Sequence, residues 1–338
     1  MLDKFTGHEE EIRNKNIISV QINLLNKCTS RCKSCRKYTW PNFELDVDEL
    51  IKIITILKID FGLQSIFFCG GDPILYKQFP KLINFLVSND IKYSLITTLL
   101  TNDKSLLELI TKTAYRIHVS VDAVEKELYK EIRGVYGYDL MKENLEYVNT
   151  IKGDNIYPII RFSSTIGKLN YNNMIDIYKF AKDHNCLLRY NYLRIWDGLS
   201  MSEENEKQFY DNLKFIVDDE RNNKEISNAS GLLKGSTGIS KINRCYLSQV
   251  SAVIDSNGDL YPCCWIMEEF NYYGEQTDKS YGNVCNKTTE QIVEEFNKRL
   301  NVCYPQNNGL CNSCVEYYGE VLTDLEKIME NRKEVLFF

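Results

Sequence analysis

The chain has 338 residues, enough for one large α/β domain and a smaller extension, and its 43% hydrophobic and 26% charged residues are typical of a globular protein. Its net charge of −6 argues against a surface that coats nucleic acid, because such a surface needs clustered lysine and arginine. The charge is compatible with a small anionic or nucleoside substrate, since one local pocket can oppose the overall sign.

The N-terminal segment, residues 1–16, is charged and lacks the apolar stretch of a signal peptide. No apolar run reaches the length of about 18–20 residues that spans a membrane. We therefore expect a cytoplasmic protein without a membrane partner, in which the 12 cysteines bind metal or stay reduced rather than form disulfides. The three histidines are scattered along the chain, which disfavours a zinc site built on histidine.

Strand-like and helix-like segments alternate up to residue 217. The expected strands are Ile17–Leu25, Ser65–Phe68, Tyr93–Thr97, Arg116–Val121, Tyr157–Ser164 and Leu187–Ile195. The expected helices are Asp46–Leu57, Phe79–Val87, Leu106–Thr111, Glu125–Ile132, Leu140–Val148, Tyr171–Asp183 and Glu203–Val217. Repeated strand–helix units imply parallel strands, and the units are too few for a closed barrel. Residues 1–220 are therefore predicted to form a partial (β/α)6 TIM barrel with ligands at the carboxyl ends of its strands.

The chain changes character after the barrel. Residues 221–242 are polar and rich in Asn, Ser, Gly and Lys, as a linker would be. In residues 243–338, Val250–Cys263 has the pattern of a β-hairpin with a turn at residues 256–258, and Thr289–Leu300 and Val321–Asn331 have helical patterns. We expect a small C-terminal domain rich in cysteine.

The first cysteine cluster, Cys28-x3-Cys32-x2-Cys35, follows the first expected strand. Because iron–sulfur clusters are usually held by four cysteines, three thiolates leave one iron open to a substrate or cofactor. The alternatives are a structural zinc knuckle and cysteines used as small core residues.

This spacing resembles the signature of radical S-adenosylmethionine enzymes, and the resemblance extends over most of the chain. It implies that Cys28, Cys32 and Cys35 hold a [4Fe–4S] cluster whose open iron is chelated by S-adenosylmethionine. It further implies that a flavodoxin- or ferredoxin-type electron donor reduces the cluster, and that the 5′-deoxyadenosyl radical so formed abstracts hydrogen from a substrate. The chain departs from the family at Ser34, where an aromatic or bulky residue is usual near the adenine; Tyr38 and Trp40 are candidates for that contact.

Gly70-Gly71-Asp72-Pro73, at the end of the second expected strand, is similar to the GGEP motif of the family. Glycines there would let the backbone approach a ligand closely. The resemblance implies that Asp72 and nearby carbonyls accept hydrogen bonds from the methionyl ammonium group. The alternative is an ordinary β-turn, since these residues favour turns.

Further candidate contacts for S-adenosylmethionine stand at or after strand ends, where family members place polar residues. Ser120-Val-Asp122 resembles the S-x-D motif near the ribose, and Arg133-Gly134 matches a recurrent Arg-Gly. Each residue alone could equally be a helix cap or a solvated loop residue. The evidence that they contact the cofactor is their order along the chain, which matches the order of such residues in the family. The remaining candidates are Thr97, Thr98, Arg161, Ser163, Asn170 and Arg194.

A second cysteine set, Cys245-x17-Cys263 and Cys311-x2-Cys314, supplies four thiolates. It resembles the twitch domain, a reduced SPASM extension, which implies one auxiliary [4Fe–4S] cluster. A zinc ribbon is the alternative. Cys264 rivals Cys263 as a ligand, because adjacent strand residues face opposite sides. The cysteines left unassigned are Cys285 and Cys303, and those expected in the core are Cys69 and Cys186.

The resemblance implies an enzyme, a lyase or an oxidoreductase, that acts on a small polar metabolite such as a nucleobase, nucleoside, sugar or aminocyclitol. Only residues 1–27 precede Cys28, too few for the leader-binding domain of many peptide maturases. Length and layout are also similar to queuine lyase, which cleaves a 7-deazaguanine base, although no diagnostic residue supports that candidate. A peptide maturase and a non-catalytic zinc-binding protein are the alternatives, and no catalytic residue is identified.

Overall fold

A computed structural model of the protein describes residues 16–35, 41–193, 198–235, 244–264, 267, 280–301 and 304–305, to which the statements below refer. Their main feature is one sheet in the order β10-β9-β8-β1-β2-β3-β4-β5-β6. The six N-terminal strands pair in parallel, each with the next along the chain. They are β1 (Ser19–Leu25), β2 (Ser65–Gly70), β3 (Lys92–Thr97), β4 (Arg116–Ser120), β5 (Ile159–Ile166) and β6 (Leu187–Tyr192).

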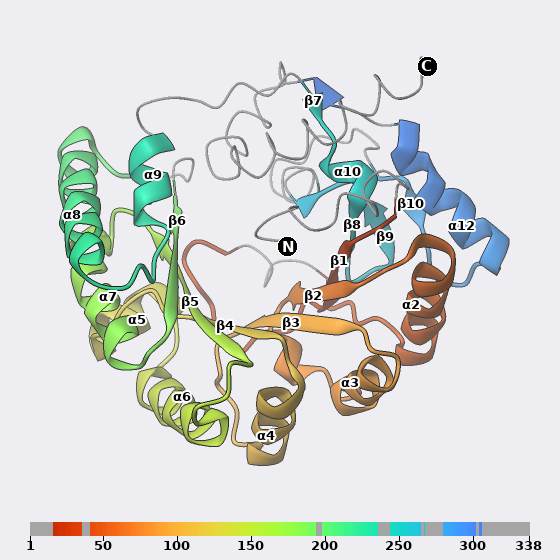
Figure 1. Cartoon of the computed structure of the whole chain (residues 1–338), viewed down its shortest axis with the longest axis horizontal. Coiled ribbons are helices and arrows are strands. Elements are labelled where there is room, and N and C mark those ends of the chain that lie inside the picture. Colours follow the sequence, from red (N-terminus) through yellow and green to blue (C-terminus); the bar gives the residue numbers. More distant parts are fainter. Residues whose placement is uncertain are drawn as a thin grey trace.

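Helices follow the strands and lie outside them, so that the strands line the inside of an open ring (Figure 1). These helices are α2 (Val47–Phe61), α3 (Phe79–Ser88), α4 (Lys104–Thr113), α5 (Lys126–Arg133), α6 (Tyr138–Lys152), α7 (Met174–Asp183) and α8 (Glu203–Asn222). Local sequence fixes their ends: the Asp46 side chain caps the start of α2, and Gly62 ends that helix with φ of 65°. The predicted α/β partial barrel is confirmed.

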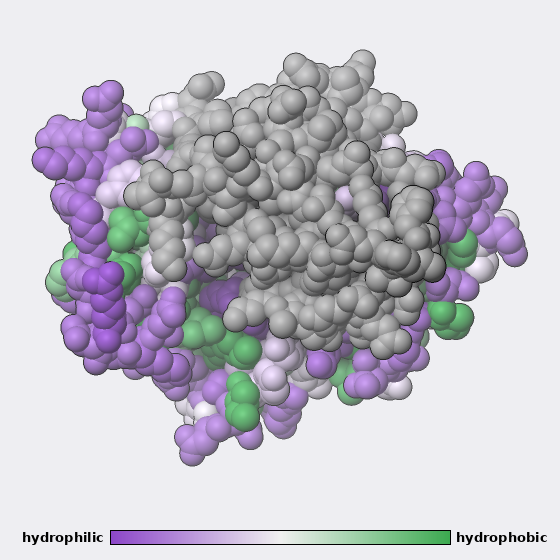
Figure 2. Space-filling view, turned by 45° about the horizontal axis from the view of Figure 1, so that its top comes forward, coloured by the Kyte–Doolittle hydropathy of each residue, from purple (hydrophilic) through white to green (hydrophobic). Residues whose placement is uncertain are grey.

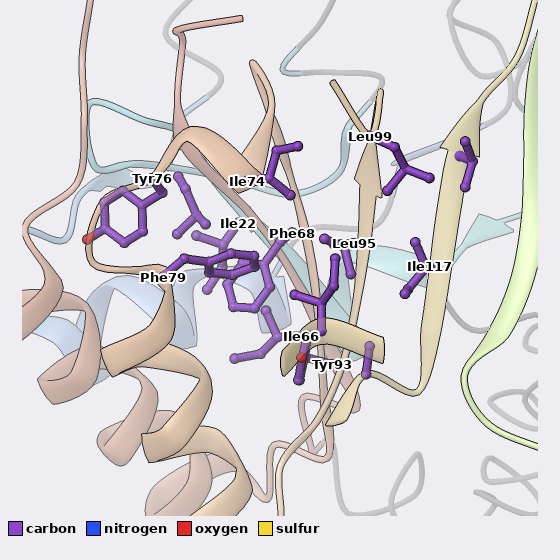
Figure 3. Close-up of a cluster of buried hydrophobic side chains, with 14 of the residues drawn as sticks. Ile22, Ile66, Phe68, Ile74, Tyr76, Phe79, Tyr93, Leu95, Leu99 and Ile117 are labelled. Atoms are coloured by element: carbon purple, nitrogen blue, oxygen red, sulfur yellow. The ribbon is translucent and has the colours of Figure 1, made fainter. Parts of the chain in front are cut away.

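The core lies between the strands and this outer layer of helices. Alternate strand residues point outward, because successive side chains of a strand face opposite sides. Phe68 of β2 meets Phe79 of α3 and Tyr93 of β3, with ring centroids 5.4 and 6.0 Å away (Figure 3). The other alternate residues face the inside of the ring, which leaves that face for polar side chains.

The predicted hairpin is present, but it joins the barrel sheet. Its strands are β8 (Ser251–Ile254) and β9 (Asp259–Tyr261), followed by β10 (Gly282–Asn283), and β8 pairs in parallel with β1. The turn closes through a hydrogen bond from Gly258 N to Asp255 O of 2.8 Å. After it, α12 (Thr289–Asn297) packs beside α2, where Phe61 and Phe296 have ring centroids 5.8 Å apart.

In the segment expected to be a linker, the described residues 221–235 follow a fixed path beside β6. The main chain of Ser227 forms a parallel bridge with Leu188 of β6, and helix α9 (Ala229–Gly235) follows. The buried carboxylate of Glu220 accepts hydrogen bonds from the amides of Ile226 and Ser227, at 3.0 and 2.8 Å. This carboxylate explains why a polar sequence adopts a fixed path, because it replaces the partners that a strand would supply.

On the face that Figure 2 shows, the described residues at the left and right margins are mostly hydrophilic, and apolar side chains are exposed in small patches. No helix that the structure describes is long and apolar enough to span a membrane.

Candidate functional site

The first cysteine cluster lies in the loop after β1, and main-chain hydrogen bonds hold this loop on two sides. Towards β2, the amides of Gly71 and Asp72 donate to the carbonyls of Leu25 and Lys27, at 2.6 and 2.9 Å. Towards α5, the amides of Arg31 and Lys33 donate to the carbonyls of Arg133 and Ile132, at 2.8 and 2.9 Å. The loop, residues 26–35, is therefore fixed between the ends of β2 and α5, and we call it the cysteine loop.

Glycine is required where these elements meet. A Cβ on Gly71 would lie 2.0 Å from Lys27 O, and Gly70 has φ of 111°. Gly134 has φ of 68°, and its Cβ would lie 2.7 Å from Arg31 O. The glycines therefore allow close approach of the backbone to the cysteine loop itself, whereas the sequence suggested close approach to a ligand.

The three thiols of the loop are partly exposed and lie close together. Burial, followed by the nearby Asp72 carboxylate, raises the pKa of Cys28 to about 11, and Cys32 and Cys35 each add to this shift. Burial also raises the pKa of Cys32, with Cys35 again contributing. The thiols are thus within electrostatic range of one another.

Three cysteine thiols in one loop have the donor chemistry of an iron–sulfur cluster. No three His, Cys, Asp or Glu side chains of the described ranges form a group that could hold one metal ion. In an iron–sulfur cluster each thiolate binds a different iron, so the sulfurs need not converge on one point. The residues present fit a cluster held by Cys28, Cys32 and Cys35.

Asp72 is 1% exposed and joins the ends of β2 and β3. Its Oδ2 accepts hydrogen bonds from Thr98 N and Thr98 Oγ1, at 2.9 and 2.6 Å. Burial raises the pKa of Asp72, and these hydrogen bonds oppose the shift. The carboxylate expected to meet a ligand ammonium therefore already accepts from several protein donors, with Ile74 N and the Thr97 side chain added to Thr98.

The two threonines shape the loop after β3. Thr97 Oγ1 accepts from Leu99 N at 3.0 Å, and Thr98 Oγ1 from Leu100 N at 3.3 Å. Thr97 is 2% exposed, so its role in the described structure is to hold this turn next to Asp72.

Asp122, expected near a ribose, forms a buried ion pair with Arg133, with Nε and Oδ2 2.8 Å apart. Its Oδ1 accepts from Thr165 N at 2.7 Å. Arg133 Nη1 also donates to Cys32 Sγ at 3.5 Å. Burial lowers the pKa of Arg133, but Asp122 and Cys32 raise it by more, so the guanidinium stays charged. The Arg133-Gly134 pair of the sequence marks this position, and the structure adds its contacts with Asp122 and Cys32.

The inner face of β4, β5 and β6 carries polar side chains. Ser120 pairs in register with Ser163, and Ser163 with Arg189. Asn191 Nδ2 donates to Ser163 Oγ at 3.1 Å.

Two residues earlier on β4 and β5, on the same face, His118 and Arg161 pair in register. Burial, followed by the charge of Arg161, lowers the pKa of His118. Sequence reasoning missed His118, Arg189 and Asn191, which the alternation along parallel strands would have placed with Arg161 and Ser163.

A small, open pocket lies between the cysteine loop and the ends of β5 and β6. Apolar side chains and Ser34 form its walls, and Thr165 and Asn170 supply polar atoms. Its apolar lining consists of Ile132, Leu169, Leu193 and Leu199.

Several predicted residues lie outside the described ranges: Arg194, Cys311, Cys314, Cys303, Tyr38, Trp40 and the helix Val321–Asn331. Cys245 is on β7 (Arg244–Cys245), and Cys263 follows β9. The four-thiol auxiliary set therefore stays a prediction, as does the choice between Cys263 and Cys264, which both pack against Val253, Tyr261 and Met267.

The chain is similar in sequence to known proteins. Residues 22–181 match the family described as the Radical SAM superfamily. Mycofactocin maturase MftC of Mycolicibacterium smegmatis is 23% identical over 256 residues, covering 72% of this chain and 62% of that protein. A probable GTP 3′,8-cyclase of Methanococcus aeolicus is 27% identical over 214 residues, covering 60% and 66%. The chain thus spans less than two thirds of these relatives.

Two solved structures share the fold. Native anSMEcpe with bound AdoMet has a TM-score of 0.66 at 16% identity, with 94% of this chain and 100% of that chain covered. Streptococcus suis SuiB bound to S-adenosylmethionine has a TM-score of 0.65 at 16% identity, covering 88% and 72%.

Proposed function

Because residues 22–181 match the radical SAM superfamily, we propose that the chain is an enzyme that holds a [4Fe–4S] cluster on Cys28, Cys32 and Cys35 and binds S-adenosylmethionine at the open iron. When bound, the reduced cluster supplies an electron that cleaves the cofactor, and the adenosyl fragment abstracts a hydrogen atom from the substrate. The observation that carries the proposal is the cysteine loop, fixed on both sides by backbone hydrogen bonds, with three adjacent thiols left partly exposed.

The pocket beside Ser34 supports a site for the adenine ring. Leu193 and Leu199 offer apolar surface for a flat ring, and Thr165 offers a hydroxyl for its edge. The small Ser34 side chain leaves room in the place where relatives carry a bulky residue. We propose that aliphatic packing replaces the usual aromatic contact.

For the substrate we propose a small polar metabolite. Arg161 and Arg189 lie on the inner face of the sheet, beside the hydroxyl of Ser163 and the amide of Asn191. Such donors suit the hydroxyl, carbonyl or acidic groups of a sugar, aminocyclitol, nucleobase or nucleoside. A peptide substrate is the second candidate, because one relative is named a maturase.

Reductive cleavage of S-adenosylmethionine tests the assignment of the first cluster. The purified full-length protein, reconstituted with iron and sulfide without oxygen, should release 5′-deoxyadenosine and methionine when reduced. Cys28→Ala should abolish this release, whereas Cys186→Ala, which alters a buried thiol before β6, should retain it. Full activity of the Cys28 variant, or stoichiometric zinc without iron, would contradict the proposal.

Iron content tests the second cluster, which we propose on Cys245, Cys263, Cys311 and Cys314. Two clusters give about eight irons per chain, and Cys311→Ala should reduce this to about four. Iron content that does not fall in the variant would argue against the assignment.

Substrate class is tested by which compounds accelerate 5′-deoxyadenosine release. At least one sugar, aminocyclitol or nucleoside should accelerate 5′-deoxyadenosine release, and Arg189→Gln should weaken that acceleration. Acceleration by peptides alone would favour a maturase.

A further inference from the structure

Arg133 connects the cysteine loop to the barrel through its side chain. It is the last residue of α5, and Gly134 ends the helix in the left-handed conformation. The Arg133 side chain is 9% exposed, and its Nη1 donates to Cys32 Sγ at 3.5 Å. Its Nε faces Asp122 Oδ2 at 2.8 Å. One guanidinium therefore contacts both a candidate cluster ligand and a buried carboxylate.

The position of this guanidinium is fixed from both sides. The carbonyls of Ile132 and Arg133 accept hydrogen bonds from the amides of Lys33 and Arg31, so the end of α5 is attached to the cysteine loop. Asp122 is held in turn, because its Oδ1 accepts from Thr165 N and its carbonyl from Asn170 Nδ2, at 2.7 and 2.8 Å. Rotation of the arginine away from Cys32 would break the ion pair with Asp122.

A donor in this position acts on a cluster electrostatically. Hydrogen bonds to the sulfurs of an iron–sulfur cluster, and its surrounding charge, set its reduction potential. A donated hydrogen bond stabilises the reduced state more, because reduction adds negative charge to the cluster and its thiolates. The site is buried, so solvent and salt screen this effect weakly.

We propose that Arg133 is a positioning residue that raises the reduction potential of the cluster through its hydrogen bond to Cys32, with Asp122 holding the guanidinium in place. This inference rests on the proposed function, because it requires a cluster on Cys28, Cys32 and Cys35. In this inference Arg133 and Asp122 act on the cluster that accepts the electron, and neither needs to contact the cofactor or the substrate.

The test is the midpoint potential of the first cluster in the reconstituted full-length protein, measured by redox titration. The titration follows the paramagnetic signal of the reduced cluster, and the signal that changes when S-adenosylmethionine is added identifies the first cluster. Arg133→Gln should shift this potential to more negative values while iron per chain stays at the wild-type level. Lys33→Gln is the matched control, because it removes a positive charge from the same loop. The Lys33 side chain is exposed and pairs with Glu131. This control should leave the potential unchanged.

The outcomes separate the two proposals. A wild-type protein that binds no iron would overturn the proposed function. A wild-type potential in Arg133→Gln with normal iron content, or an equal shift in Lys33→Gln, would overturn the inference alone. If Arg133→Gln loses its iron, Arg133→Lys decides, because lysine keeps the charge and loses the planar fork of donors. A negative shift in that variant supports the inference, and an unchanged potential overturns it.

Discussion

Asp72 joins the cysteine loop, through its amide, to the loop after β3, through its carboxylate. Asp72→Asn keeps the size of the side chain but loses the charge that strengthens both bonds from Thr98. We expect the free energy of unfolding to fall by about 1–3 kcal/mol, because buried partners lose a charged acceptor. Urea denaturation measures this change.

Asp48→Asn is the control, since this carboxylate is 73% exposed in its ion pair with Lys81. Exposed pairs contribute little, so we expect a loss below about 1 kcal/mol. Equal losses in the two variants would show that the network around Asp72 is not stabilising.

His118 makes stability depend on pH. Its pKa is lowered by burial, then by Arg161 and other nearby arginines, so the folded protein holds it neutral while the unfolded chain protonates near pH 6.5. The unfolded state therefore binds more protons as the pH falls below about 6.5, and stability falls with it, by at most about 1.4 kcal/mol per pH unit. His118→Gln should flatten this slope, measured by urea denaturation between pH 7 and pH 5.

The control for His118 is Phe67→Leu, which alters a ring 5.3 Å from the imidazole without removing a titrating group. It should lower stability by a similar amount at every pH. An unchanged slope in His118→Gln would contradict the assignment of the pH dependence to this side chain.

At the level of residues, the sequence predicts where Asp72 and Asp122 lie but not what they contact. Both follow strands, as expected. Their side-chain partners, Thr98 and Arg133, come from other βα units, and the Arg133 contact with Cys32 joins residues 101 apart. Local patterns carry no information on such pairs, because these depend on how the strands align.

The loop between β3 and α4 depends on a side chain from another helix. Leu99 has φ of 57°, which is unfavourable for leucine, and Asn144 of α6 donates to the carbonyls of Leu99 and Thr101, each at 2.7 Å. Asn144→Ala leaves both carbonyls without this donor. We expect a loss of about 2–4 kcal/mol in the free energy of unfolding, against less than about 1 kcal/mol for the exposed Asn155→Ala. Similar losses would show that Asn144 does not hold the loop.

The contact between the β2 loop and the cysteine loop is tested at Gly71. Gly71→Ala places a methyl group 2.0 Å from Lys27 O, so the two loops must separate. We expect loss of cluster iron after reconstitution, whereas Gly231→Ala in α9, which has open space around it, should bind iron like the wild type. Normal iron content in Gly71→Ala would mean that the cysteine loop tolerates the displacement.

At the level of elements, the sequence predicts each of the barrel strands and helices, because their apolar residues repeat with the period of the element. It does not predict that β8 adds to β1, or that residues 226–235 continue beside β6. β8 has four residues, all buried, and residues 226–235 lack a long periodic pattern. Short segments take their structure from the edge they pair with, which the sequence does not reveal.

At the scale of the whole molecule, the continuous sheet means that part of the C-terminal region completes the barrel. Asn23 of β1 is fully buried, and its amide donates to Asp255 Oδ1 at 2.8 Å, while Ser256 donates to Asn26 at 2.8 Å. Without these residues β1 becomes an edge strand with unpaired backbone groups, and a buried amide next to the cysteine loop loses its partner.

A chain that ends at residue 242, the end of the predicted linker, therefore should not fold as an independent barrel. We expect it to bind a dye for exposed apolar surface, to unfold without a cooperative transition and to hold no iron, because the β1 edge and the cysteine loop are adjacent. The full-length variant Cys311→Ala, which changes the C-terminal cysteines but keeps β8 to β10, should unfold cooperatively. Cooperative unfolding of the shortened chain would show that the hairpin is an appendage, and that the barrel holds the cysteine loop in place without the strand that pairs with β1.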